Sequence, residues 1–195
     1  MVVLSLAPQS AYAEDRSIVV LGDSISAAYG IQREEGWVHL FAQQLKQQEL
    51  TWQVVNASIS GETTSGGLAR LPGVLSRHTP DVVIIELGGN DGLRGYPVGK
   101  MRANLMAMVD LIEAAGATPV IAAMRIPPNY GPRYTRAFEA VFNEVAAERD
   151  TLLIPFLMES VALADGMMQD DGIHPTAAAQ PLLLEVVATS LAELL

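Results

Sequence analysis

Five short apolar segments alternate along the chain with segments whose apolar residues recur at helical spacing. The apolar segments cover residues 17–22, 51–57, 81–87, 117–123 and 151–156. The helical segments that follow them cover 36–49, 66–78, 100–116, 133–150 and roughly 176–195. Strands that are apolar at successive positions are typical of parallel sheets with both faces covered by helices. The alternation therefore predicts one α/β domain built on a five-stranded parallel sheet.

The composition excludes several classes of function. A net charge of −10, from 12 basic and 22 acidic residues, argues against nucleic acid or an anionic membrane surface as the main partner. The chain has no cysteine, which excludes disulfides and thiolate chemistry. Its three histidines form no paired metal-binding motif, and its glycines form no phosphate-binding loop. We therefore expect no metal and no cofactor.

The first residues, MVVLSLAPQSAYAED, combine an apolar run at 2–7 with a small-x-small sequence at 11–13. This pattern resembles the end of an export signal cleaved after Ala13, although the run is short and no basic residue precedes it. We expect residues 1–13 to be a signal remnant and 14–195 to form the single domain. The protein would then be periplasmic or secreted. If the N-terminus is as given, we expect the protein to be cytoplasmic instead. No run approaches the ~20 apolar residues of a membrane span.

Polar residues follow three of the predicted strands, at the edge where parallel sheets bind ligands. Ser24 follows the first strand in GDSIS and is expected to open a helical stretch, whose positive end would favour a developing anion. Gly61 follows the second strand, where a glycine lets a backbone N–H approach a ligand closely. Asn90 follows the third strand in GGNDG and supplies an amide donor. Each residue also has an ordinary explanation as a helix cap or a turn former.

The segment DGIHP places Asp171 three residues before His174 and Pro175 directly after it. A carboxylate at this distance can hold an imidazole in one orientation, and we expect the proline to stiffen the turn at the start of the last helix. His39 and His78 lie in helical segments and are predicted to be surface or packing residues.

Together these residues form the complete set of groups that acyl transfer needs. Ser24 would attack a carbonyl carbon, and His174 would take the serine proton and later give it to the leaving group. Asp171 would orient the imidazole and stabilise its protonated form. The Ser24 N–H, the Gly61 N–H and the Asn90 side chain would donate to the oxyanion.

The blocks GDSIS, NASISGETTSGG, GGND and DGIHP, in this order, resemble those of the SGNH hydrolases, also called GDSL-type esterases. The resemblance covers nearly the whole chain after residue 17. It looks closest to the bacterial subgroup of thioesterase I, lysophospholipase and arylesterase enzymes, through ELGGNDGLRG and PPNYGPRY. It implies a flavodoxin-like three-layer α/β/α fold, export to the periplasm and hydrolysis of carboxylic esters. It also implies Ser24, Gly61, Asn90 and His174 as the four namesake residues, with Asp171 completing the triad.

The substrate pocket is less well defined by the sequence. Apolar residues in the loops at the predicted edge favour an acyl chain over a sugar, and the low aromatic content argues mildly against a carbohydrate groove. The candidate pocket residues are Leu93, Pro128, Tyr130, Met168 and Ile173. A carbohydrate acetyl esterase, an acyltransferase and a flavodoxin-like module that binds a nucleotide or phosphate remain as alternatives. The oligomeric state is not predicted.

Overall fold

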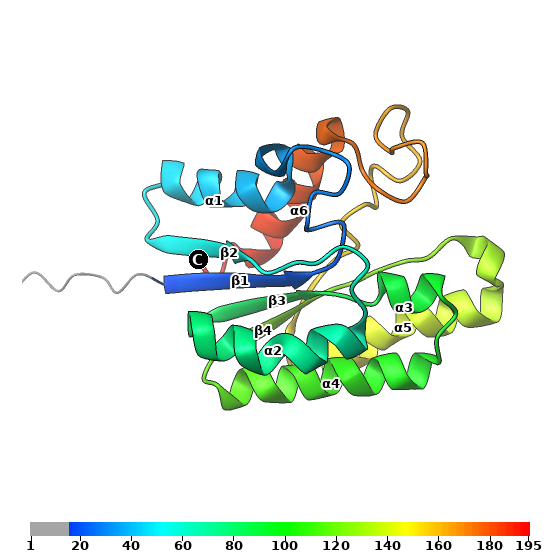
Figure 1. Ribbon diagram of the computed structural model, residues 1–195, viewed down its shortest axis with the longest axis horizontal. Helices are drawn as coiled ribbons and strands as arrows, with labels where there is room; N and C mark the ends of the chain where they lie inside the picture. The colour runs from blue at the N-terminus through cyan, green and yellow to red at the C-terminus, as the bar shows by residue number, and fades with distance from the viewer. Residues whose placement is uncertain (1–15) are drawn as a thin grey trace, which may run out of the picture.

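The computed structural model describes residues 16–195, which form a five-stranded parallel sheet with helices on both faces (Figure 1). The strand order is β2-β1-β3-β4-β5. The strands are β1 (Arg16–Gly22), β2 (Trp52–Asn56), β3 (Val82–Glu86), β4 (Thr118–Ala122) and β5 (Leu152–Ile154). This is the flavodoxin-like order, whose ligand crevice lies beyond the carboxyl ends of β1 and β3. The predicted fold class is confirmed.

Helices cover the two faces of the sheet unequally. One face carries α2 (Thr64–His78), α4 (Val98–Ala114) and α5 (Pro132–Glu148), and the other carries α1 (Trp37–Gln47) and α6 (Gln180–Leu191) (Figure 1). The short helix α3 (Gly89–Leu93) follows β3 directly. Three single 3₁₀ turns cover Arg33–Glu35, Pro128–Tyr130 and Ala177–Ala179. No helix of the described residues 16–195 has the length and hydropathy to cross a bilayer.

The core is divided by the sheet into two clusters because successive residues of a strand point to opposite faces. Val19 and Leu21 of β1 pack toward α2, α4 and α5, whereas Ile18 and Val20 pack toward α1 and α6. All four side chains are fully buried. The first strand is therefore apolar at every buried position, and the polar residues begin only where it leaves the sheet.

One helix contains a proline away from its first turn: Pro72 lies in the interior of α2. It lies on the exposed side of the helix, where water can solvate the carbonyl that loses its N–H partner. The last helix is shorter than expected, because a 3₁₀ turn precedes Gln180. The suspected signal remnant at residues 1–13 lies outside the described residues.

Candidate active site

The nucleophile candidate lies in a tight turn that begins directly after β1. The backbone N–H of Ala27 bonds to the Asp23 carbonyl at 3.0 Å, and that of Tyr29 bonds to the Ser24 carbonyl at 3.1 Å. Ala28 adopts a left-handed conformation with φ 58°, so the chain turns away instead of continuing as a helix. The expectation that Ser24 opens a helix is therefore wrong, and no helix dipole contributes at this serine.

A continuous line of hydrogen bonds joins three of the predicted residues. His174 Nε2 lies 2.9 Å from Ser24 Oγ, and His174 Nδ1 lies 2.6 Å from Asp171 Oδ2. Both distances lie within the range required for proton transfer between a nucleophile and its base. The arrangement can take a proton from the serine hydroxyl while the carboxylate holds the imidazole in one orientation.

The turn that carries Asp171 and His174 is held by hydrogen bonds to the Asp171 carboxylate. Asp171 Oδ1 accepts the backbone N–H groups of Ile173 at 2.9 Å and of His174 at 3.0 Å. These bonds, with that to the imidazole, lower the pKa of Asp171 from its ordinary value to about 2, and the backbone N–H of His174 makes the largest contribution. Asp171 is therefore ionised at neutral pH.

The end of this turn differs from the sequence-based expectation. Pro175 does not begin the last helix but pairs with Met168 in an isolated antiparallel bridge. The N–H of Gln169 bonds to the His174 carbonyl at 2.8 Å, and that of Thr176 bonds to the Met167 carbonyl at 2.8 Å. The turn is thus closed as a small hairpin, which fixes the backbone on both sides of the histidine.

Each of the three predicted oxyanion donors has a hydrogen that finds no acceptor among the described residues 16–195. Within the described residues 16–195, the N–H groups of Ser24 and Gly61 make no intramolecular hydrogen bond. Asn90 donates one amide hydrogen to Asp23 Oδ2 at 3.1 Å, which leaves the second hydrogen free. Gly61 has φ +79°, a left-handed conformation that disfavours other residues. Free donors beside a nucleophile suit an anion that forms only during reaction.

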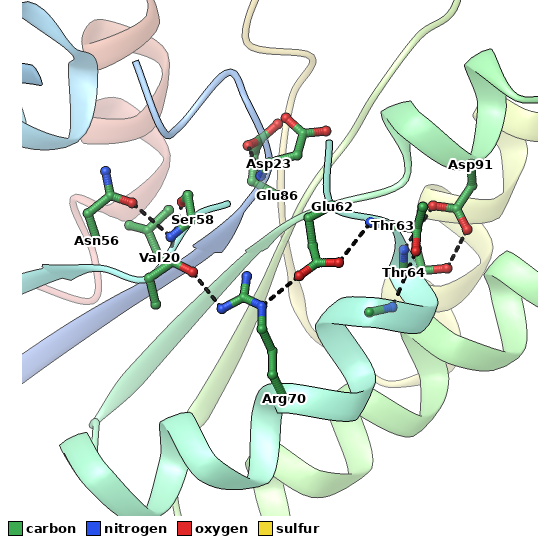
Figure 2. A network of polar contacts seen from close by, with 12 residues as sticks. Val20, Asp23, Asn56, Ser58, Glu62, Thr63, Thr64, Arg70, Glu86 and Asp91 are labelled. Carbon is green, nitrogen blue, oxygen red and sulfur yellow. Dashed lines mark hydrogen bonds and ion pairs between the residues drawn. The ribbon is translucent and has the colours of Figure 1, made fainter. Parts of the chain in front are cut away.

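Two buried carboxyl groups close to Ser24 were not identified from the sequence. Asp23 and Glu86 are 3% and 2% exposed, and Figure 2 shows their side chains close together at the carboxyl edge of the sheet. Burial raises the pKa of Asp23 to about 6, although bonds from Ile25 and Asn90 oppose this effect. Burial, followed by the proximity of Asp23, raises the pKa of Glu86 well above its ordinary value. An acidic residue at the end of the apolar strand VVIIE was the available signal.

Glu86 is held by donors from the turn that follows β1. Its Oε2 accepts the Ser26 hydroxyl at 2.7 Å and the Asp23 N–H at 3.3 Å. Since Gly22 and Glu86 are paired residues of β1 and β3, a side chain at Gly22 would collide with the Glu86 carboxyl group. The turn that carries Ser24 is therefore bonded to the neighbouring strand β3 by the buried Glu86 carboxyl group.

A cavity of about 610 Å³ opens beside the serine and the histidine. Four of the five predicted pocket residues line it, namely Leu93, Pro128, Met168 and Ile173. Tyr130 does not line the cavity, and its hydroxyl donates to the carbonyl of the lining residue Leu93 at 2.7 Å. Further lining residues, which the sequence did not single out, are mostly apolar and include Met124, Ile126, Phe156, Leu157, Met158, Ala162 and Leu163.

Of the residues that supply the predicted donors, Ser24 and Asn90 line this cavity and Gly61 does not. The segment before Gly61 is tied to the nucleophile strand, because the Ile59 N–H bonds to the Gly22 carbonyl at 3.0 Å. Within residues 16–195, no group of three or more histidine, aspartate and glutamate side chains is placed to share a metal ion.

Comparison with known proteins gives a consistent result. The family model described as the GDSL-like lipase/acylhydrolase family matches residues 20–181. The chain is 49% identical to Esterase TesA of Pseudomonas aeruginosa, over 98% of this chain and 96% of that protein. It is 45% identical to thioesterase 1/protease 1/lysophospholipase L1 of Escherichia coli strain K12, over 90% and 83% of the two chains.

Solved structures agree with the sequence relatives. A crystal structure of TesA superimposes with a TM-score of 0.90 at 50% identity, covering 92% of this chain and all of the other. The resemblance inferred from the four sequence blocks is confirmed. The chain belongs to the GDSL-like lipase/acylhydrolase family, the SGNH hydrolases, and is a carboxylic ester hydrolase.

Proposed function

We propose that the chain hydrolyses carboxylic esters and thioesters through an acyl-enzyme intermediate on Ser24. The observation that carries this proposal is the unbroken line of hydrogen bonds from Asp171 through His174 to the serine hydroxyl. A serine with a positioned base and an oriented imidazole is the arrangement that activates a hydroxyl as nucleophile.

The reaction proceeds in two halves. Ser24 Oγ attacks the carbonyl carbon while its proton passes to His174 Nε2, and a tetrahedral oxyanion forms. The carbon–oxygen or carbon–sulfur bond then breaks, and His174 returns the proton to the leaving alcohol or thiol. In the second half, water attacks the acyl-enzyme and gives a proton to His174. The bond between the acyl carbon and Ser24 Oγ then breaks, His174 returns the proton to Ser24, and the carboxylic acid leaves. Asp171 accepts the Nδ1 hydrogen throughout and stabilises the imidazolium.

The tetrahedral oxyanion is bound by the Ser24 N–H, the Gly61 N–H and the second amide hydrogen of Asn90. This assignment is supported by the lack of intramolecular acceptors for these hydrogens within residues 16–195. Each such donor typically lowers the barrier by about 3 kcal/mol when the site excludes water. Asp23 accepts the first Asn90 hydrogen and so directs the second toward the oxyanion.

The substrates are esters with an apolar acyl group: aryl esters, acyl thioesters and lysophospholipid-like esters. The support is the largely apolar wall of the cavity beside Ser24, together with the thioesterase and lysophospholipase named in the Escherichia coli relative. A sugar substrate would instead call for a polar or aromatic lining. Export to the periplasm is part of the proposal, and it is supported by the small-x-small sequence at 11–13.

The test is hydrolysis of p-nitrophenyl esters from acetate to palmitate, and of acyl-CoAs of similar lengths, by wild type, Ser24→Ala and Ser76→Ala. Ser76 is an exposed serine of α2 and serves as the matched control. We expect wild type and the control to be active, and Ser24→Ala to lose activity by at least about 10⁴-fold with folding intact. Equal turnover by Ser24→Ala would overturn the mechanism, and activity on acetate alone would favour a carbohydrate acetyl esterase. Ester product formed when an alcohol is added would favour an acyltransferase.

A further inference from the structure

The two proposed oxyanion donors besides Ser24 come from different connections of the sheet. Gly61 lies between β2 and α2, and Asn90 lies in α3 after β3. Such donors must be held within about 0.5 Å of their productive positions to stabilise a transition state. Gly61 is exposed, has no side chain and adopts a left-handed conformation. Its backbone N–H must therefore be held in position by contacts from other residues.

Asp91, the residue after Asn90, is hydrogen-bonded to the first residue of α2. Both oxygens of the Asp91 carboxylate are used: Oδ2 accepts the Thr64 N–H at 2.8 Å, and Oδ1 accepts the Thr64 hydroxyl at 2.6 Å. Both residues are buried, and Figure 2 shows the two bonds between them. We call the connection between β2 and α2, residues 57–63, the Gly61 segment. Thr64 follows it directly, so the bonds between Asp91 and Thr64 join α3 to the end of the Gly61 segment.

The residue one turn after Asn90 contacts the glycine itself. Arg94 Nη2 donates to the Gly61 carbonyl at 3.1 Å, and the Arg94 N–H bonds to the Asn90 carbonyl at 3.2 Å. A single residue is thus bonded to both donor-bearing residues. Asp91 and Arg94 reach the same segment from positions i+1 and i+4 relative to Asn90.

The Gly61 segment is also bonded to β1, through the Ile59 N–H and the Gly22 carbonyl, and to α2. Arg70 of α2 pairs with Glu62 at 2.8 Å and donates to the Ala57 carbonyl at 2.6 Å, and Glu62 accepts the Thr63 N–H (Figure 2). These bonds stiffen the segment against α2, which follows it directly. They do not relate it to α3, whereas the bonds of Asp91 and Arg94 do.

We propose that Asp91 and Arg94 are positioning residues that hold Gly61 in register with Asn90, so that two donors from separate connections bind the oxyanion as one unit. The inference rests on the proposed function. It predicts that loss of either residue weakens transition-state binding more than substrate binding.

Arg94→Met is the main test because Arg94 is exposed and the variant keeps an apolar stem. We expect kcat on p-nitrophenyl butyrate to fall about 10-fold with KM within about twofold, since a misplaced donor costs less than a deleted one. The affinity for an alkyl boronic acid, which forms a tetrahedral adduct with a serine, should fall in parallel. Arg94→Lys, which keeps a donor, should restore part of kcat. Arg102→Met, which removes two surface ion pairs from α4 to Glu144 and Glu148 of α5, is the control and should match wild type.

A double-mutant cycle separates positioning from general stability. In an Asn90→Ala background, Arg94→Met should cost clearly less than in wild type, because the pair of donors is already broken. Asp91→Asn should reduce kcat in the same sense and also lower the Tm, because Asp91 is buried. Equal losses in both backgrounds, or Arg94→Met matching Arg102→Met in kcat and boronate affinity, would overturn the inference. An inactive wild type, or an active Ser24→Ala, would instead overturn the proposed function.

Discussion

The phenol ring of Tyr29 lies against the imidazole of His174, with ring centroids 4.4 Å apart and ring planes inclined by 38°. The Gln169 side chain donates to the Tyr29 carbonyl at 2.8 Å and to the Pro175 carbonyl at 3.0 Å. One amide therefore ties the turn that carries the nucleophile to the turn that carries the base. Two contacts therefore keep the Tyr29 ring beside the imidazole: the packing of the two rings, and the Gln169 bonds that join the backbones of the two turns.

The Tyr29 ring should help to hold the imidazole of His174 in place. Tyr29→Leu removes the ring face that packs on the imidazole, so kcat on p-nitrophenyl butyrate should fall several-fold. Tyr29→Phe keeps that face and should follow wild type. Equal losses in the two variants would contradict a role for the ring face. Turnover of wild type should fall on the acid side, because a protonated imidazole cannot accept the serine proton. A flat profile between about pH 5 and 8 would count against His174 as the base.

Replacing Asp171 by asparagine should impair the base without removing it. The amide cannot stabilise an imidazolium and favours the wrong tautomer, so kcat should fall by about 10²–10⁴-fold. Asp170 is the neighbouring, exposed aspartate, and Asp170→Asn is the matched control that should retain full activity. Steady-state kinetics on one p-nitrophenyl ester checks both variants. Similar kcat values for the two would contradict the assignment of Asp171.

Alanine at Gly61 should reduce both stability and activity. Its φ of +79° costs an alanine about 1–2 kcal/mol, and the added Cβ meets nothing closer than Arg94 Nη2 at 3.8 Å. Gly116, at the opposite end of the sheet, has φ +80° and open space around it, so Gly116→Ala carries the same strain. Urea unfolding should show equal losses for the two variants. Only Gly61→Ala should lose kcat, and an equal loss in Gly116→Ala would assign the effect to strain alone.

Asp23 should make the free energy of unfolding fall as the pH rises. Its pKa is raised to about 6 in the folded protein, so the folded state binds more protons than the unfolded state between about pH 4 and 6. Its contribution is fully present below that window and is lost as the pH rises through it. Asp23→Asn removes this loss, so the variant should gain stability relative to wild type from pH 4 to pH 7. Urea unfolding at both pH values measures the difference, and a constant or opposite difference would contradict the shift.

The fold was predictable because its central strands are apolar at nearly every position. Residues 81–87 are apolar and β-branched over a length that suits a strand, and β3 occupies Val82–Glu86. The elements α4 and α5 lie within two residues of their expected bounds. The helical spacing of apolar residues predicted the position of these helices, because each helix buries one row of apolar side chains against the sheet.

The site was predictable only in part, for physical reasons. Few polar residues follow the carboxyl ends of the strands, and a parallel sheet brings those residues to the same edge. The burial of Asp23 and Glu86 depends on neighbours far away in the chain, so local sequence carries little sign of their raised pKa values. The helix expected at Ser24 fails because Ala28 takes a left-handed conformation that its residue type does not suggest. The cavity wall from Phe156 to Leu163 comes from an irregular connection without periodicity.

Ser24 and His174 are 150 residues apart in the chain, although the Ser24 Oγ and His174 Nε2 atoms lie 2.9 Å from each other. On the ribosome, Ser24 emerges long before the turn that carries His174. If the two residues act together as proposed, a growing chain displays the serine hydroxyl without the group that removes its proton. Ester turnover then requires that the first and last segments of the sheet layers have come together, so it reports on their assembly.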